Sequence, residues 1–177
     1  MLTKVYLGVG SNLNRDNAIL FGNEKLKELF STYVHSSVYQ SRAIREAEPD
    51  YYNLVVGGET ALSLEELLTK IGDIEKEAGT ELMFHNGTNF GLKRRLDIDV
   101  LLYGDLVTTE PCKLPRHDIQ DYPFVLCPLC ELDSTIVHPL LNIAISEIWT
   151  EMAPRLPEKM RVSKVDFDFS RSFSDWN

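Results

Sequence analysis

The order of the apolar repeats along the chain constrains its fold more than any other feature. Four stretches have the apolar pattern of β-strands, and two stretches between them have the spacing of amphipathic helices. The predicted strands are residues 2–9, 33–41, 51–60 and 96–103, and the predicted helices are residues 16–30 and 63–78. This β-α-β-β-α-β order predicts an α+β fold, a ferredoxin-like sandwich in which helices pack on one face of an antiparallel sheet.

The remaining segments are less regular. Residues 79–93 contain three glycines and no clear apolar period, so we expect a mobile loop there. Residues 114–132 lead from a loop into an apolar helical segment, and residues 140–152 have the pattern of a further amphipathic helix. We expect a single domain over residues 1–177, with a core of about 2–153 and a C-terminal tail that either packs back or stays loose.

The composition argues against several classes of function. Of the 177 residues, 44% are hydrophobic and 25% are charged, as in ordinary soluble globular proteins, and no apolar run is long enough to span a bilayer. The first residues enter a strand pattern without a signal peptide, so we expect a cytoplasmic protein. The net charge of −9 argues against general nucleic-acid binding, which needs a broad basic surface, but not against a small anionic substrate.

The stretch "KRRLDIDVLLYGD", residues 93–105, carries two carboxylates inside an apolar strand. Because side chains of a strand alternate between its faces, Asp97 and Asp99 share one face while Ile98 and Val100 share the other. Two close carboxylates repel each other, and a divalent cation that prefers oxygen ligands, such as Mg²⁺, removes this repulsion. The spacing alone leaves two interpretations open, a Mg²⁺ site or a solvated face of the sheet.

Three cations, Lys93, Arg94 and Arg95, stand directly before the two aspartates. Arginine binds phosphate oxygens through paired hydrogen bonds, and Mg²⁺-binding carboxylates beside an arginine are the parts of a phosphoryl-transfer site. If the strand already includes Arg94 and Arg95, these two alternate, and only one of them can join the aspartates. The sequence contains neither a Walker A loop nor a GxGxxG motif.

Several segments together resemble the 6-hydroxymethyl-7,8-dihydropterin pyrophosphokinase (HPPK) family of folate biosynthesis. They occur in family order from about Lys4 to about Leu132. The segments are "VYLGVGSNL", "SSVYQS", "DYYNLVVGGET", "LSLEELLTKIGDIEKEAG", "RRLDIDVLLYGD" and "LPRHD…FVLCPLCEL". The resemblance implies transfer of the pyrophosphoryl group of ATP to the hydroxymethyl group of the pterin, with two Mg²⁺ ions.

The resemblance also implies roles for residues on the ATP side. Asp97 and Asp99 would hold both Mg²⁺ ions. Arg94 would contact the phosphates of ATP and then the product, and Glu75 would be an acidic residue on the nucleotide side.

On the pterin side, the resemblance assigns Tyr51 and Asn53 to the binding pocket, with Ser41 in the place of a family threonine. Phe90 and Phe124 correspond to two aromatic rings that enclose the pterin. A flat heterocycle with polar edges needs aromatic faces and a few hydrogen-bond partners, which agrees with this set. Core packing is the alternative interpretation for Phe90 and Phe124.

The sequence departs from the family pattern in the predicted loop. Thr80, Glu81 and Leu82 stand where the family has basic residues that close over the triphosphate. Glu81 is expected to repel ATP.

Two further departures follow the strand of the aspartates. Arg116 replaces the family histidine, and His117 is displaced from it by one position. We assign both residues to ATP binding and catalysis, Arg116 as a phosphate partner and His117 as a substitute for the lost imidazole. Tyr122 stands where the family has an arginine on the nucleotide side.

Two functional hypotheses remain, beside that of a plain structural domain. The first is an active pyrophosphokinase whose substrates are ATP and hydroxymethyldihydropterin. The second is a degenerate paralogue that binds a pterin or a nucleotide with little or no transfer. For both we expect a monomer or weak homodimer, without nucleic-acid or membrane partners.

Overall fold

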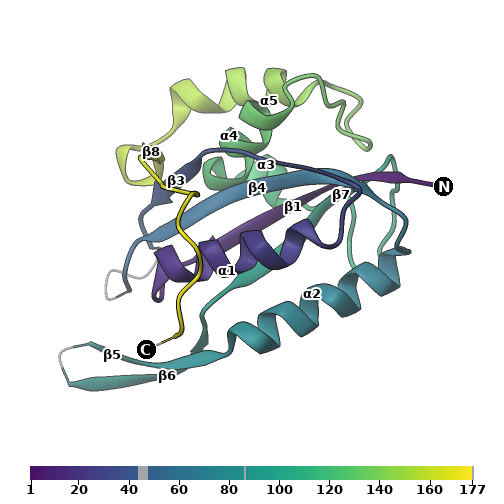
Figure 1. Ribbon diagram of the computed structural model, residues 1–177. Helices are drawn as coiled ribbons and strands as arrows, with labels where there is room; N and C mark the ends of the chain where they lie inside the picture. The colour runs from purple at the N-terminus through teal and green to yellow at the C-terminus, as the bar shows by residue number, and fades with distance from the viewer. Residues whose placement is uncertain (44–47, 86, 177) are drawn as a thin grey trace.

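The structure is a computed structural model that describes residues 1–43, 48–85 and 87–176, without the side chains of 85, 88 and 90. Its centre is a six-stranded antiparallel sheet with the strand order β7-β1-β4-β3-β8, in which β2 also pairs with β4 (Figure 1). The strands are β1 Thr3–Ser11, β2 Thr32–His35, β3 Val38–Ser41, β4 Tyr51–Thr60, β7 Asp97–Tyr103 and β8 Ser163–Val165. The predicted ferredoxin-like α+β fold is therefore confirmed.

The predicted second strand is divided into β2 and β3 by two serines. The Ser36 hydroxyl donates to the Ser37 carbonyl (2.8 Å) and accepts the N–H of Val55 (3.0 Å), so a side chain takes the place of a backbone partner in the ladder. Both segments still pair with β4. The break therefore interrupts the strand without removing either part from the sheet.

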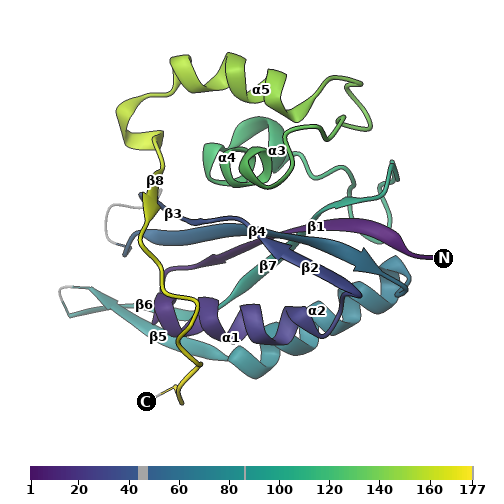
Figure 2. The same ribbon diagram turned by 45° about the horizontal axis from the view of Figure 1, so that its top comes forward.

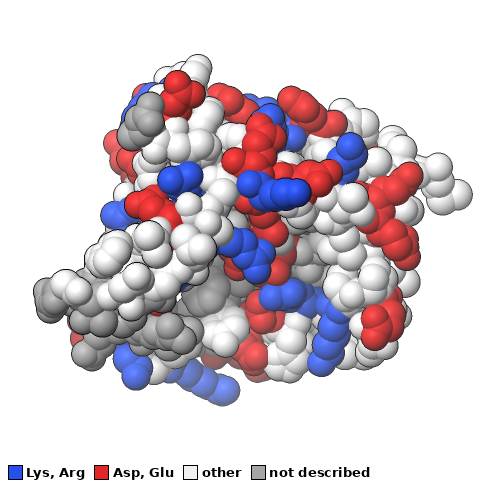
Figure 3. Space-filling model, turned by 90° about the horizontal axis from the view of Figure 1, so that it is seen from below, with Lys and Arg blue, Asp and Glu red and all other residues white. Residues whose placement is uncertain are grey.

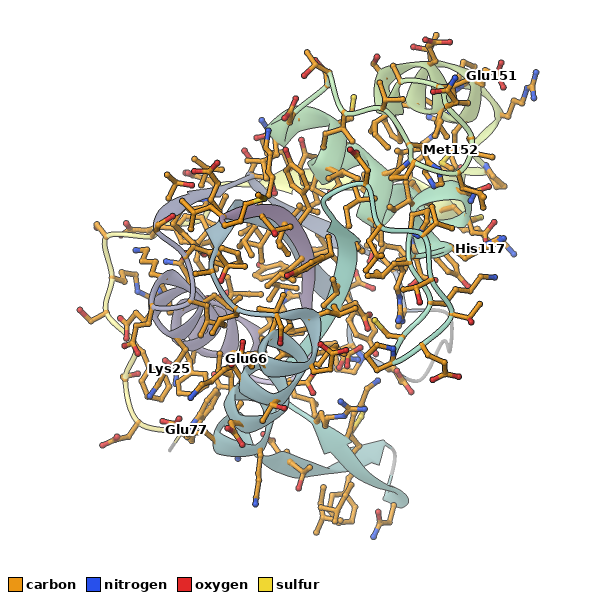
Figure 4. The ribbon with its side chains drawn as sticks, turned by 90° about the vertical axis from the view of Figure 1, so that its right-hand side faces the viewer. Lys25, Glu66, Glu77, His117, Glu151 and Met152 are labelled. Atoms are coloured by element: carbon orange, nitrogen blue, oxygen red, sulfur yellow. The ribbon has the colours of Figure 1, made fainter. Side chains whose placement is uncertain are left out.

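One face of the sheet is covered by α1, Arg15–Lys27, and α2, Leu64–Ala78. The predicted capping box is present at the start of α2, where Ser63 and Glu66 each bond the other's backbone N–H. Lys25 of α1 and Glu77 of α2 pair across the two helices at 2.7 Å (Figure 4). Acidic and basic side chains are intermixed on the side of the molecule seen from below (Figure 3).

The opposite face carries α3, Asp118–Asp121, α4, Pro123–Leu132, and α5, Ile145–Met152 (Figure 2). The expectation of helices on one face only was therefore wrong. The central strands are apolar on both sides: Leu7 and Val56 belong to the core cluster with α1 and α2, while Tyr6 and Val55 belong to the cluster with α4. A sheet with two apolar faces needs cover on both.

The segment predicted as a loop is a β-hairpin that extends from the body of the molecule (Figure 1). Its strands are β5, Thr80–His85, and β6, Thr88–Arg94, which pair with each other in a separate two-stranded sheet. Glycines at positive φ, Gly79, Gly87 and Gly91, and a register shift after Met83 interrupt the apolar alternation. This is why the sequence pattern did not reveal the strands.

The C-terminal tail packs back on the core. After two short 3₁₀ helices, Ala153–Arg155 and Glu158–Met160, β8 pairs with β3, and the chain then crosses α1 (Figure 1). The aromatic residues of the tail that pack against the core are Phe167, Phe169, Phe173 and Trp176. None of the helices in the described part of the chain is long and apolar enough to cross a membrane.

Asp133, at the end of α4, joins this helix to β1. Its carboxylate accepts hydrogen bonds from Lys4 Nζ and Tyr6 Oη, both at 2.7 Å, and from the Thr135 hydroxyl at 2.6 Å. Burial acts to raise the pKa of Asp133, but these hydrogen bonds outweigh it and hold the pKa well below its usual range. The ionised form is therefore favoured in the folded protein.

We expect Asp133→Asn to lower the free energy of unfolding by about 1 to 2 kcal/mol at pH 7. The contribution of a carboxylate with a lowered pKa is complete above its unfolded pKa and is lost as the pH falls toward the folded value. The difference from wild type should therefore shrink between about pH 5 and pH 2. Urea unfolding at several pH values measures this, with Asp73→Asn, an exposed aspartate on α2, as the control. A difference that does not change with pH would contradict the assignment.

Candidate active site

A pocket of about 750 Å³ opens between β7, β4, the start of α4 and the hairpin. Most of the residues predicted for the site line it. These are Ser41, Tyr51, Asn53, Asp97, Asp99, Arg116 and Phe124. Arg94, Glu75 and His117 lie outside this lining, and the side chain of Phe90 lies outside the described part of the structure.

The floor of the pocket is formed by β1, which lies between the two strands that carry the polar residues. Gly10 is paired with Asp97 on one side and with Asn53 on the other, and Gly8 is paired with Asp99. Cross-strand partners share a face of the sheet. A Cβ atom at Gly10 would come to 3.4 Å from Oδ1 of Asn53. The two glycines thus keep the space between the carboxylates and Asn53 open.

Asp97 and Asp99 point to the same side, as the strand alternation predicted. Both line the pocket, while Ile98 belongs to the core cluster on the other side of the sheet. Burial raises the pKa of Asp99 to about 6; Arg116 opposes the increase, and the charge of Asp97 adds to it. The pocket therefore favours an added positive charge beside these carboxylates.

The donor set fits a magnesium ion. The described residues contain no group of three or more His, Cys, Asp or Glu side chains that could hold a metal ion by themselves. A magnesium ion does not need such a group. Magnesium is usually held by one or two carboxylates and completes its shell with water and substrate phosphates. Asp97 and Asp99 could supply such carboxylates.

Arg94 and Glu75 form a second layer beside this pair. Glu75 of α2 accepts the backbone N–H of Ile98 (2.8 Å) and a hydrogen bond from Arg94 (2.9 Å), and Arg94 lies 3.6 Å from Asp97 Oδ1. Burial raises the pKa of Glu75, and the hydrogen bond from Ile98 and the charge of Arg94 act against this. Glu75 thus ties α2 to the first residues of β7 and positions Arg94.

Arg116 and His117 have different environments. The Arg116 guanidinium lies 3.0 Å from both Asp99 and Asp118, and its backbone N–H donates to the Leu101 carbonyl (2.9 Å). His117 instead lies at the outer edge of the molecule, with Nδ1 2.5 Å from Asp121 (Figure 4). Of the two, Arg116 is the one placed to meet a ligand in the pocket.

The other end of the pocket combines a buried amide with aromatic rings. Nδ2 of Asn53 donates to the Ser41 hydroxyl (2.9 Å), and both residues are buried. Phe124 is stacked on Tyr122, with ring centroids 5.0 Å apart and an interplanar angle of 23°. The amide and the aromatic pair line one cavity, where they could hold the edge and the face of a flat heterocycle.

Sequence reasoning missed part of the lining. The sequence does not distinguish Lys93 from the two cations that follow it. In the structure Lys93 lines the pocket, forms an ion pair with Glu48 and stands 4.9 Å from the centroid of the Tyr51 ring. The family resemblance indicates only that Tyr122 replaces an arginine. In the structure Tyr122 lines the pocket beside Phe124. Alternation along a strand places Lys93 and Arg94 on opposite faces, so it could have predicted that only one of them lines the pocket. The sequence pattern did not predict the strand β6, however.

Comparisons with known proteins identify relatives of this chain. The model of the family 7,8-dihydro-6-hydroxymethylpterin-pyrophosphokinase (HPPK) matches residues 6–134. Two proteins named 2-amino-4-hydroxy-6-hydroxymethyldihydropteridine pyrophosphokinase are each 35% identical over 153 residues. The one from Aquifex aeolicus matches 85% of this chain and 92% of its own length. The one from Haemophilus influenzae matches 84% and 92%.

Larger proteins contain a similar region. A folate synthesis bifunctional protein from Arabidopsis thaliana is 34% identical over 75% of this chain, which spans 27% of that protein. A solved structure of a Plasmodium falciparum HPPK-DHPS triple mutant with pteroate aligns with a TM-score of 0.70 at 11% identity, covering 93% of this chain and 47% of that one. The structural likeness supports the fold. The family match and the two 35% identical relatives show that this chain belongs to the 7,8-dihydro-6-hydroxymethylpterin-pyrophosphokinase family.

Proposed function

We propose that this chain transfers the pyrophosphoryl group of ATP to the hydroxymethyl group of 6-hydroxymethyl-7,8-dihydropterin, which gives the pterin diphosphate and AMP. One observation carries the proposal: a single pocket brings the Asp97–Asp99 pair together with the Asn53 amide and the Phe124 ring. A phosphoryl donor and a flat acceptor could thus meet within one cavity. The names of the two 35% identical relatives describe this class of enzyme and favour it over a degenerate paralogue.

The geometry of the hairpin removes one argument for the degenerate paralogue. Glu81 was expected to repel ATP, but its carboxylate lies 3.2 Å from Nε of Arg95. A paired carboxylate presents much less net charge to a ligand than a free one. The substitution of a basic residue by Glu81 therefore leaves this part of the hairpin close to neutral.

Asp97 and Asp99 are the residues that would hold Mg²⁺, and we assign two ions to the complex with ATP. Bound Mg²⁺ neutralises charge on the phosphates and orients them. Arg116 and Arg94 would donate to phosphate oxygens, for which the planar guanidinium is well suited. Lys93 adds a cation on the hairpin side of the same pocket.

The pterin would bind at the opposite end. The hydrogen bond from Asn53 to Ser41 fixes the orientation of the amide, so its carbonyl oxygen is turned toward the space beside Gly10. An amide oxygen held in this way can accept a hydrogen bond from an N–H group on the edge of a ring. Phe124 would cover one face of the ring, with Phe90 assigned to the other face.

The function is tested by measuring AMP formed from ATP with hydroxymethyldihydropterin and Mg²⁺. Transfer predicts AMP and pterin diphosphate in equal amounts. A protein that is stabilised against heat by the pterin but forms no AMP would be the binding paralogue. A protein that neither substrate stabilises would contradict both hypotheses.

Asp97→Asn and Asp99→Asn should each lower AMP formation by about a hundredfold or more, because each removes an ionised oxygen ligand at the centre of the charge change. The free energy of unfolding should change by less than about 1 kcal/mol, since loss of carboxylate repulsion offsets loss of the contacts to arginine. The control is Asp105→Asn, an exposed aspartate just after the same strand, which should keep full activity. Wild-type turnover in either variant would exclude the metal assignment.

Asn53→Ala should raise the KM for the pterin by about tenfold or more and leave the KM for ATP unchanged, because the amide is lost only from the pterin end. It should also destabilise the fold by about 1 to 2 kcal/mol, since the buried Ser41 hydroxyl loses its partner. Ser41→Ala is the matched variant, because it keeps the amide but not its orienting partner. It should raise the pterin KM less. Steady-state kinetics with each substrate varied in turn decide this, and an equal rise in both KM values would contradict the assignment.

A further inference from the structure

Arg95 lies at the junction of the hairpin with the body of the molecule. Its backbone N–H donates to the Gly79 carbonyl (3.1 Å), and its own carbonyl accepts the Ser11 hydroxyl (2.6 Å). Its guanidinium donates to the Ala78 carbonyl (3.3 Å) and to Glu81 (3.2 Å). One side chain therefore connects the end of α2 with the first residues of β5.

The C-terminal tail reaches the same side chain. The Arg95 guanidinium stands 5.0 Å from the centroid of the Trp176 ring, within the range of a cation–π contact. The Trp176 ring packs in turn on Phe21 of α1 (centroids 5.3 Å apart) and on Phe173 (4.9 Å). Arg95 is thus held between the hairpin and an aromatic cluster on α1.

The tail is anchored to α1 by polar contacts beside this cluster. The buried Asn17 side chain donates to the Ser174 carbonyl (2.7 Å) and accepts the Ser174 N–H (3.0 Å). Glu24 accepts the N–H of Phe173 (3.1 Å). Both views of the fold show the C-terminal end beside α1, on the side from which the hairpin extends (Figures 1 and 2). These contacts hold the tail against α1 and so fix the position of Trp176 beside Arg95.

The hairpin contributes residues to the lining of the pocket. Met83, Leu92 and Lys93 of the hairpin line the pocket, and Asp97 lies only two residues after Arg95. The turn into the hairpin is at Gly79, whose φ of +77° is open to glycine but strained for other residues. A change in the contacts of Arg95 would therefore alter the position of the hairpin relative to the pocket.

We infer that Trp176 and Arg95 are positioning residues, through which the C-terminal tail sets the position of the β5–β6 hairpin over the pocket. The tail acts on Arg95, and Arg95 acts on Gly79 and Glu81 at the hairpin base. The effect on turnover rests on the proposed function, whereas the effect on the hairpin itself does not.

The structural readout is amide hydrogen exchange of the purified chain of residues 1–177. Trp176→Ala should speed exchange in residues 80–94 by about three- to tenfold, which corresponds to the strength of one partly exposed cation–π contact. Trp176→Phe, which keeps an aromatic face, should restore most of the protection. Phe169→Ala is the matched control, because Phe169 belongs to the same tail but packs on His35 (4.1 Å). It should leave the hairpin unchanged.

The kinetic readout separates positioning from a general loss of stability. Trp176→Ala should raise the KM for ATP by about three- to tenfold, whereas Phe169→Ala should leave this KM unchanged. Arg95→Gln should raise the KM for ATP at least as much, because it also removes the partner of Glu81. Adding Trp176→Ala to Arg95→Gln should have little further effect, since Trp176 acts through Arg95. Additive effects of the two substitutions would overturn the proposed route.

The two readouts distinguish the failure of each claim. If wild type forms no AMP but hairpin exchange still depends on Trp176 and Arg95, the proposed function fails and the control of the hairpin by the tail stands. If exchange in residues 80–94 is the same in wild type and in Trp176→Ala, the inference fails whatever the activity. Equal acceleration by Phe169→Ala would also overturn it, because the tail would then act by general packing.

Discussion

The pairing of β1 between β4 and β7 is the constraint on which the site depends. A single register places Gly10 between Asp97 and Asn53, and Gly8 between Asp99 and Val55. A shift of one residue would turn the aspartates into the apolar core, because side chains alternate along a strand. Burial of the core residues of β1, such as Leu7, therefore also fixes the distance between the carboxylates and the amide.

The sequence predicted the features that depend on local periodicity. Alternation alone placed Asp97 and Asp99 on one face, and the spacing of Ser63 and Glu66 located the start of α2. These patterns involve neighbours in the chain, so they can be read without knowledge of the fold. The family resemblance then indicated that Asn53 and Phe124, far apart in sequence, would share a site.

The features that were missed depend on contacts between distant segments. The hairpin strands are stabilised by pairing with each other, and glycines and a register shift obscure their period. The position of His117 is decided by Asp121, one turn later on a short helix, whereas its neighbour Arg116 is held by Asp99 from another strand. From the local sequence, Arg116 and His117 are equally good candidates for the site. Only their tertiary contacts show that Arg116 lines the pocket and His117 does not.

The cations around the pocket are paired with carboxylates in this acidic chain. Arg116 is paired with Asp99 and Asp118, Arg94 with Glu75, and Arg95 with Glu81. Such pairs hold the guanidinium groups in place without substrate and limit the repulsion among the carboxylates. A triphosphate that bound here would compete with these partners for the same donors, so its binding would exchange one set of ion pairs for another. The net attraction of the pocket for a triphosphate is therefore smaller than the number of arginines suggests. A metal ion bound to the carboxylates would take over their charge and make the exchange of ion pairs more favourable. Loss of basic residues from the hairpin thus need not remove ATP binding, because the remaining cations depend on how their acidic partners are neutralised.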